Sequence, residues 1–146
     1  MRKARATKGI VLHVEDDDAV ATSTELLLRL AGFRTWRAVD GEAALKLVTG
    51  GDVHPDVLIA DYNLPGEMDG ADTVEALCRA LHEAVPTILL SGELTDAGLP
   101  WVPGAPLWPM SKPAPPELLV HAVETFAEMH RWLAAHRAAP PVPRCA

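Results

Sequence analysis

The chain has 146 residues, close to the commonest domain size, which predicts a single domain with one hydrophobic core. Hydrophobic residues make up 49% of it and charged residues 23%, a composition typical of a globular protein and unlike that of a disordered one. The net charge of −7 argues against a basic face that binds nucleic acid or an anionic membrane surface.

The cysteines and the absence of a signal or membrane-spanning pattern indicate the cellular compartment. Cys78 and Cys145 form neither a disulfide framework nor a metal-ligand spacing, so we expect a reducing compartment and a cytoplasmic protein. No apolar run reaches membrane-spanning length, and no signal-peptide pattern follows the basic start. We expect a flexible N-terminus over 1–7, one domain over 8–138 and a tail over 139–146, with no DNA-binding module after the domain.

Strands and helices alternate in the first half of the domain. An apolar run over 9–14 ends in four consecutive acids, which predicts a buried strand. A helix follows, with Asp17 or Asp18 as its N-cap and Gly32 just past its end. The apolar residues that define its spacing are Val20, Leu27, Leu30 and Ala31. An alternating run over 33–38 predicts a second strand, and Asp40 can cap a short second helix that Gly50-Gly51 ends.

In the second half, four apolar residues over 57–60 lead into Asp61 and then a Leu-Pro-Gly breaker, which predicts a buried strand that ends at this acid. An amphipathic helix should begin near residues 70–72, and its apolar stripe includes Cys78, which we interpret as a packing cysteine. A further strand is predicted over 86–92.

The remaining elements contain many prolines. Five Gly or Pro residues between 93 and 106 predict a fourth helix that is short or irregular. A fifth strand over 107–111 contains Pro109, which favours an edge position, because proline cannot donate a ladder hydrogen bond. Pro115-Pro116 then opens a long helix that runs to about Arg137.

This alternation predicts an α/β fold with a five-stranded parallel sheet, in the flavodoxin-like order 2-1-3-4-5, and helices on both faces. Ligands of such sheets bind beyond the carboxyl ends of the strands, where the winding reverses between strands one and three. Both of those strands end in acids. Glu15, Asp16 and Asp61 should therefore converge, with Ser91 and Lys112 beside them from strands four and five.

The predicted convergence has a chemical consequence. Two carboxylates about 4 Å apart repel by roughly 4 kcal/mol at an effective dielectric near 20, so three in one crevice require a cation or bound protons. Oxygen ligands suit Mg²⁺ or Mn²⁺, and a backbone carbonyl near Asn63 could join them. Asp61 is then free to attack phosphorus as a nucleophile. Lys112 and the Ser91 hydroxyl could hold phosphoryl oxygens.

At these residues the chain resembles a two-component response regulator receiver domain over about residues 8–138. The motifs that carry the resemblance are Val14-Glu15-Asp16-Asp17, Asp61-x-x-Leu64-Pro65-Gly66, Leu90-Ser91-Gly92 and Lys112-Pro113. The resemblance implies the CheY-like receiver fold and a signalling domain rather than an enzyme, assisting only its own phosphorylation and dephosphorylation. It also implies a histidine kinase or histidine phosphotransfer protein as partner.

The same resemblance assigns roles to individual residues. Asp61 would accept the phosphoryl group, and Glu15 and Asp16, with Asp61 and the Asn63 backbone carbonyl, would hold Mg²⁺. Ser91 would be the switch hydroxyl. Lys112 would contact the phosphoryl group, and the peptide bond to the following proline would be cis. Residues Asn63 and Glu93 would occupy positions that tune the lifetime of the aspartyl phosphate.

Two features depart from the family pattern. Pro109 stands where receivers commonly carry the aromatic residue that turns inward on phosphorylation. The adjacent Trp108 could replace it, although a tryptophan at strand spacing more often packs in a core or an interface. The breaker-rich segment 93–106 corresponds to the output helix of relatives, so signal relay through that helix should be altered, shortened or lost.

Three functions therefore stay open. The first is a phosphorylatable receiver that acts as a relay or switch, with a protein partner or homodimer contact through residues 93–138. The second is a constitutive interaction module with a vestigial acidic pocket, in which Trp101, Trp108 and Trp132 mark the binding surface. The third is a metal-dependent phosphohydrolase, disfavoured because Asn63 stands where a general acid would be expected.

The histidines complete the set of candidate residues. None of the six has a ligand partner at compelling spacing. His82 and the three histidines of the last helix, His121, His130 and His136, are interpreted as solvated helix positions.

Overall fold

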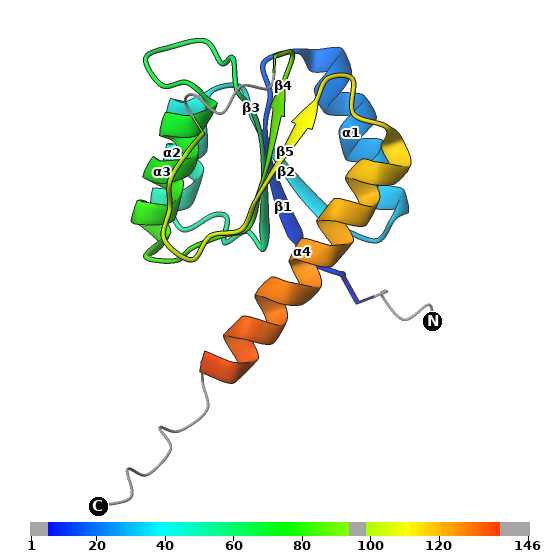
Figure 1. Ribbon diagram of the computed structural model, residues 1–146, viewed down its shortest axis with the longest axis vertical. Coiled ribbons are helices and arrows are strands. Elements are labelled where there is room, and N and C mark those ends of the chain that lie inside the picture. Colours follow the sequence, from blue (N-terminus) through cyan, green and yellow to red (C-terminus); the bar gives the residue numbers. More distant parts are fainter. Residues whose placement is uncertain (1–5, 94–98, 138–146) are drawn as a thin grey trace, which may run out of the picture.

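The computed structural model describes residues 6–93 and 99–137 and shows one α/β domain in which strands and helices alternate (Figure 1). The predicted N-terminal segment 1–7 lies mostly, and the predicted tail 139–146 entirely, outside the described residues. The elements are β1 (Ile10–Val14), α1 (Asp18–Leu30), β2 (Arg34–Ala38), α2 (Gly41–Thr49), β3 (Val57–Asp61), α3 (Gly70–Leu81), β4 (Thr87–Ser91), β5 (Leu107–Ser111) and α4 (Pro116–Arg137).

The five strands form one parallel sheet in the order β2-β1-β3-β4-β5, as predicted. The winding reverses between β1 and β3, which lie side by side with Val14 opposite Ala60. The carboxyl ends of β1 and β3 therefore meet at the same edge of the sheet. This edge is the place where a ligand site is expected.

Helices cover both faces of the sheet: α1 and α4 lie on one face, and α2 and α3 on the other (Figure 1). Each face has its own core, one containing Leu28, Ile59 and Phe126 and the other containing Leu58 and Leu77. All five residues of β3 are buried, because both of its faces are covered. This two-sided burial explains why the sequence of the strand is continuously apolar rather than alternating.

Aspartates cap the amino ends of α1, α2 and α3. Asp17 accepts a hydrogen bond from the backbone N–H of Val20, and Asp40 accepts one from Ala43. Each bond satisfies a donor that the first helical turn leaves without an intrahelical partner. Asp69 and Asp72 form a reciprocal capping box at the start of α3.

The apolar face that the sequence predicted for α1 was only partly right, because Leu27 and Ala31 pack against the core whereas Val20 and Leu30 are exposed. The buried residues are Ala21 and Leu28, whereas Val20 is 40% and Leu30 79% exposed. Because leucines stand at three consecutive positions of this helix and again at Leu30, the spacing fits more than one face.

The chain between β4 and β5 follows the predicted irregular course where it is described. Residues 99–106 contain a turn and no helix, and residues 94–98 lie outside the described part. β5 is an edge strand, as Pro109 predicted, and pairs only with β4 in the sheet order. Within the described residues, no helix is both long and apolar enough to cross a membrane.

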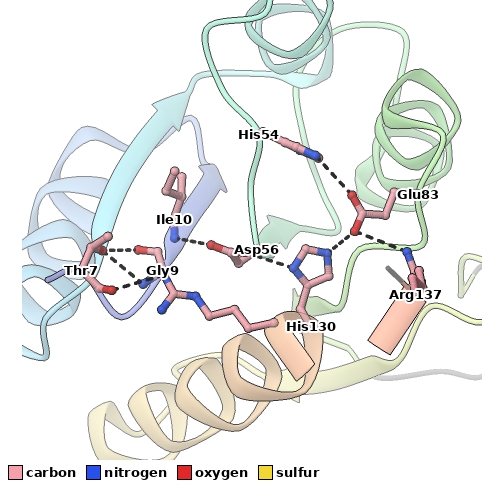
Figure 2. Close-up of polar contacts among 9 residues, drawn as sticks. Thr7, Gly9, Ile10, His54, Asp56, Glu83, His130 and Arg137 are labelled. Atoms are coloured by element: carbon pink, nitrogen blue, oxygen red, sulfur yellow. Dashed lines mark hydrogen bonds and ion pairs between the residues drawn. The ribbon is translucent and has the colours of Figure 1, made fainter. Parts of the chain in front are cut away.

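Near the amino-terminal ends of the strands, a polar cluster around His130 joins α4 to the loops before β3 and after α3 (Figure 2). The imidazole Nδ1 lies 3.1 Å from Asp56 Oδ1, and Nε2 contacts Glu83 Oε1. His130 is 5% exposed, so its interpretation as a solvated helix position was wrong. The helical pattern could not reveal this, because the two acids come from loops far away in the sequence.

Candidate functional site

Three acids meet at the carboxyl edge of the sheet, as the predicted topology required. Glu15 and Asp16 follow β1, and Asp61 is the last residue of β3. One oxygen from each carboxylate can be chosen so that all three oxygens lie within 4.8 Å of one another. Glu15 is 1% and Asp61 5% exposed, while Asp16 faces solvent.

Lys112 reaches this cluster from the residue after β5. Its ammonium forms an ion pair with Asp61 Oδ2 and lies 4.0 Å from Glu15 Oε2. The backbone of Lys112 donates a 2.9 Å hydrogen bond to the carbonyl of Ser91, which fixes the lysine to the end of β4. The Lys112–Pro113 peptide bond is cis, as the family resemblance implied.

Glu15 carries a carboxylate whose bonding is incomplete. Oε1 accepts a 3.1 Å hydrogen bond from the Asp17 backbone, whereas Oε2 is buried and has no hydrogen-bond partner among the described residues. Burial raises the pKa of Glu15, and the charges of Asp61 and Asp16 add to this effect, while the Asp17 N–H and Lys112 oppose it. A buried acceptor without a donor is costly, and a hard cation would satisfy it. The donor set therefore fits a divalent ion such as Mg²⁺ or Mn²⁺.

The backbone around Asp61 is fixed from two sides. The Asn63 N–H points at Asp61 Oδ1 at 3.3 Å, so the loop after β3 turns back toward the carboxylate. Gly70, the first residue of α3, donates a 2.7 Å hydrogen bond to the carbonyl of Tyr62. Together these contacts hold the Asp61 carboxylate at the end of β3.

Ser91 lies at the end of β4, next to β3, with Leu90 opposite Asp61 in the register. Its hydroxyl donates a 2.7 Å hydrogen bond to the carbonyl of Glu93 and accepts a 3.2 Å hydrogen bond from the Glu93 N–H. The side chain is thus engaged with its own loop. The described contacts bring together Glu15, Asp16, Asp61 and Lys112, with Ser91 on the adjoining strand end.

Among the described residues, the cysteine and the tryptophans that the sequence analysis named make no hydrogen bond with the acidic cluster. Cys78 is buried in α3, as predicted, and burial raises the pKa of its thiol. Trp108 packs edge-on against Phe126 with ring centroids 5.9 Å apart, while Trp101 and Trp132 are largely exposed.

One residue at the site was missed from the sequence. Arg37 near the end of β2 binds the loop that carries Glu15 and Asp16. Within an alternating strand it reads as an ordinary exposed position, and only the pairing of β1 with β2 brings it to the loop.

A five-stranded sheet in this order, with acids at its switch point and a lysine after β5, defines the class of CheY-like receiver domains. The chain belongs to the family described as the response regulator receiver domain, whose sequence model matches residues 11–124. This match covers most of the domain and includes every residue of the acidic cluster.

Curated relatives agree with this membership. The transcriptional regulatory protein PrrA of Mycobacterium leprae is 43% identical over 81 residues, which cover 56% of this chain and 33% of PrrA. The DNA-binding response regulator MtrA of Mycolicibacterium smegmatis is 35% identical over 117 residues, or 77% of this chain and 48% of MtrA. The chain thus spans one third to one half of the length of these two relatives.

Solved structures give the same result for the fold. The N-terminal domain of a response regulator/sensory box/GGDEF 3-domain protein from Carboxydothermus hydrogenoformans aligns with a TM-score of 0.72 and 26% identity, covering 86% of this chain and 98% of that one. The receiver domain of the hybrid histidine kinase CckA aligns with a TM-score of 0.67 and 29% identity, covering 82% and 99%.

Proposed function

We propose that this chain is a phosphorylation-responsive signalling domain in which Asp61 accepts a phosphoryl group from a histidine kinase or a histidine phosphotransfer protein. The observation that supports this most directly is the setting of the Asp61 carboxylate. It is 5% exposed, paired with Lys112, and close enough to the oxygens of Glu15 and Asp16 to share a cation with them.

In the proposed reaction, an oxygen of Asp61 attacks the phosphorus of the donor's phosphohistidine, the P–N bond breaks, and the imidazole leaves. The carboxylates of Glu15, Asp16 and Asp61 and the Asn63 backbone carbonyl would hold Mg²⁺ or Mn²⁺. When bound, the ion supplies positive charge that offsets the negative charge of the phosphoryl oxygens. The Lys112 ammonium would exchange its contact with Asp61 for a phosphoryl oxygen, and the Ser91 hydroxyl would leave the Glu93 carbonyl to donate to another.

Phosphorylation would act by shifting the population between two conformations of the domain. The change would be read by a protein partner, or by a second copy of the chain, through residues 93–138. In this proposal the domain acts in the cytoplasm and catalyses only its own phosphorylation and dephosphorylation.

Phosphoryl transfer to Asp61 can be tested by intact mass. Wild type and Asp61→Asn are incubated with Mg²⁺ and a small acyl phosphate, and we expect one added phosphoryl group on wild type alone. Asp52→Asn, at an exposed acid in the turn before β3, is the matched control and should be labelled like wild type. Absence of labelling on wild type, or equal labelling of Asp61→Asn, would refute the proposal.

The alternative is a constitutive interaction module. It is favoured by Pro109 in place of the usual aromatic residue and by two tryptophans on the surface, Trp101 at 79% and Trp132 at 58% exposure. Under this alternative, partner affinity would be the same for the chain with and without a phosphoryl group. A marked phosphate-dependent change in affinity would exclude it.

A further inference from the structure

Arg37 lies on β2, next to the loop after β1 that carries Glu15 and Asp16. It is the fourth residue of β2 and pairs in register with His13 of β1, two residues before Glu15. The next residue, Ala38, accepts a 2.9 Å hydrogen bond from the backbone N–H of Glu15. The Arg37 side chain is 30% exposed, so most of it is covered by protein.

Three nitrogens of this one guanidinium bind two carbonyls of the loop and the first residue of α1. Nε donates to the carbonyl of Glu15 at 3.0 Å, and Nη2 donates to the carbonyl of Asp16 at 3.2 Å. Nη1 donates to Asp18 Oδ1 at 2.6 Å. A planar fork with fixed donors can address several acceptors at once, which an ammonium group cannot do with the same geometry.

The loop needs such a restraint because of the charges that it carries. Glu15 and Asp16 present carboxylates toward Asp61, and like charges at this separation push their backbones apart. On its other side the loop is fixed to α1 by the Asp17 cap. The guanidinium holds the two carbonyls on the β2 side, so the peptide units of the two acids are fixed between two elements.

We propose that Arg37 is a positioning residue for the metal-dependent acceptor site. It holds the Glu15 and Asp16 carbonyls so that both carboxylates face one divalent cation together with Asp61. The inference deepens the proposed function, on which it rests. It has a clear alternative, because a guanidinium that acted only through its charge would repel the cation and weaken its binding.

The test separates geometry from charge with two variants. Arg37→Lys keeps the positive charge and the aliphatic stem but loses the planar fork of donors. Arg37→Gln loses both the charge and the fork. Arg34→Gln, an exposed arginine at the start of the same strand, is the matched control. Mn²⁺ affinity is measured by the loss of the free-ion electron paramagnetic resonance signal, with thermal unfolding in the presence of a chelator to confirm folding.

If Arg37 positions the loop, both Arg37 variants bind Mn²⁺ about tenfold more weakly, as expected when two or three hydrogen bonds that organise a site are lost. The control binds like wild type. Phosphorylation of the variants should need more metal but reach, at saturating metal, a rate within about twofold of wild type. Unchanged binding by Arg37→Lys, or tighter binding by Arg37→Gln, overturns the inference.

The same experiment distinguishes a failure of this inference from a failure of the proposed function. A wild-type chain that binds Mn²⁺ but gains no phosphoryl group contradicts the acceptor role, and weakened binding by the variants then still supports positioning by Arg37. A wild-type chain that is phosphorylated normally, with variants that bind Mn²⁺ equally well, contradicts the Arg37 inference alone.

Discussion

At the scale of single residues, Gly70 shows how closely α3 approaches the end of β3. A β-carbon at this position would lie 2.3 Å from the Asp61 carbonyl oxygen and 2.7 Å from Tyr62 Cα. Both neighbours are backbone atoms, so no change of side-chain rotamer can relieve the overlap. Any side chain at position 70 must therefore push α3 and the end of β3 apart.

We predict that Gly70→Ala lowers the free energy of unfolding by about 1–3 kcal/mol, the usual cost of overpacking, as measured by urea denaturation. It should also slow phosphorylation, because Asp61 is displaced relative to Lys112. Gly92→Ala is the control, since a β-carbon there meets open space, and it should change stability by less than about 0.5 kcal/mol. A Gly70→Ala variant as stable as wild type would contradict the close approach.

At the scale of elements, α4 is fixed to the amino-terminal edge of the sheet by charge rather than by its apolar face alone (Figure 2). His130 lies between Asp56, before β3, and Glu83, after α3. Asp56 also accepts a 2.9 Å hydrogen bond from the Ile10 N–H. Glu83 lies 3.3 Å from His54 Nε2 and 3.6 Å from Arg137 Nη1.

The protonation state of His130 follows from these neighbours. The hydrogen bond to Asp56 raises the pKa of His130 above 6.5, with support from Glu83 and against the effect of burial. Burial acts to raise the pKa of Asp56, but the hydrogen bonds from His130 and Ile10 and nearby positive charge outweigh it and lower that pKa below 3.8. The stabilisation from His130 is therefore complete below pH 6.5 and is lost as pH rises through its folded pKa. The stabilisation from Asp56 is lost as pH falls below 3.8.

We predict that His130→Gln lowers the free energy of unfolding by about 3 kcal/mol between pH 4 and 6.5, because it leaves two partly buried carboxylates without their cation. This deficit should shrink as pH rises from 6.5 through the higher folded pKa of His130, where the wild type loses the same charge. Urea denaturation across this pH range measures the effect. His121→Gln, at an exposed position of the same helix, is the matched control and should change the free energy of unfolding by less than about 0.5 kcal/mol. A deficit for His130→Gln that stayed constant to alkaline pH would contradict a protonated His130.

The sequence predicted the type and order of the strands and helices better than it predicted which face of each helix is buried. The apolar runs of β1 and β3 and the acids that follow them are local signals, and they were sufficient to place both strands. The buried face of α1 was only partly right, because several leucines offer alternative faces, and the choice between Leu28 and Leu30 depends on how the helix lies against the sheet. The burial of His130 likewise depends on where α4 crosses the loops before β3 and after α3.

At the scale of the whole molecule, the parallel topology made most of the site predictable. Once β1 and β3 are neighbours, Glu15, Asp16 and Asp61 must meet, and Lys112 follows from the position of β5 beside β4. Arg37 was not predictable in this way, because its role depends on the path of a side chain across a loop. The rules of topology thus predict which side chains meet at the site, while the contacts that support them require the structure.

Three carboxylates meet where β1 and β3 end, and their mutual repulsion gives a prediction for metal removal. Two carboxylates within 4.8 Å repel by about 3 kcal/mol at an effective dielectric near 20, and a bound cation offsets this cost only in the folded state. Mg²⁺ about 100-fold above its Kd should therefore stabilise wild type by ~2.7 kcal/mol, and chelation should remove this gain. For a chain of this length the gain corresponds to a Tm increase of about 5–10 °C.

Asp16→Asn should be at least as stable as wild type without metal and less stable than wild type with Mg²⁺. In the presence of a chelator its Tm should equal or exceed that of wild type, because one repelling charge is gone, while the increase caused by Mg²⁺ should fall to a small fraction of the wild-type value. Asp52→Asn, which removes the same charge far from the cluster, should keep the wild-type response. Thermal unfolding of the three proteins with chelator and with Mg²⁺ measures both effects. A full Mg²⁺ response in Asp16→Asn would show that the ion binds elsewhere, since the conflict among Glu15, Asp16 and Asp61 is what the cation is expected to relieve.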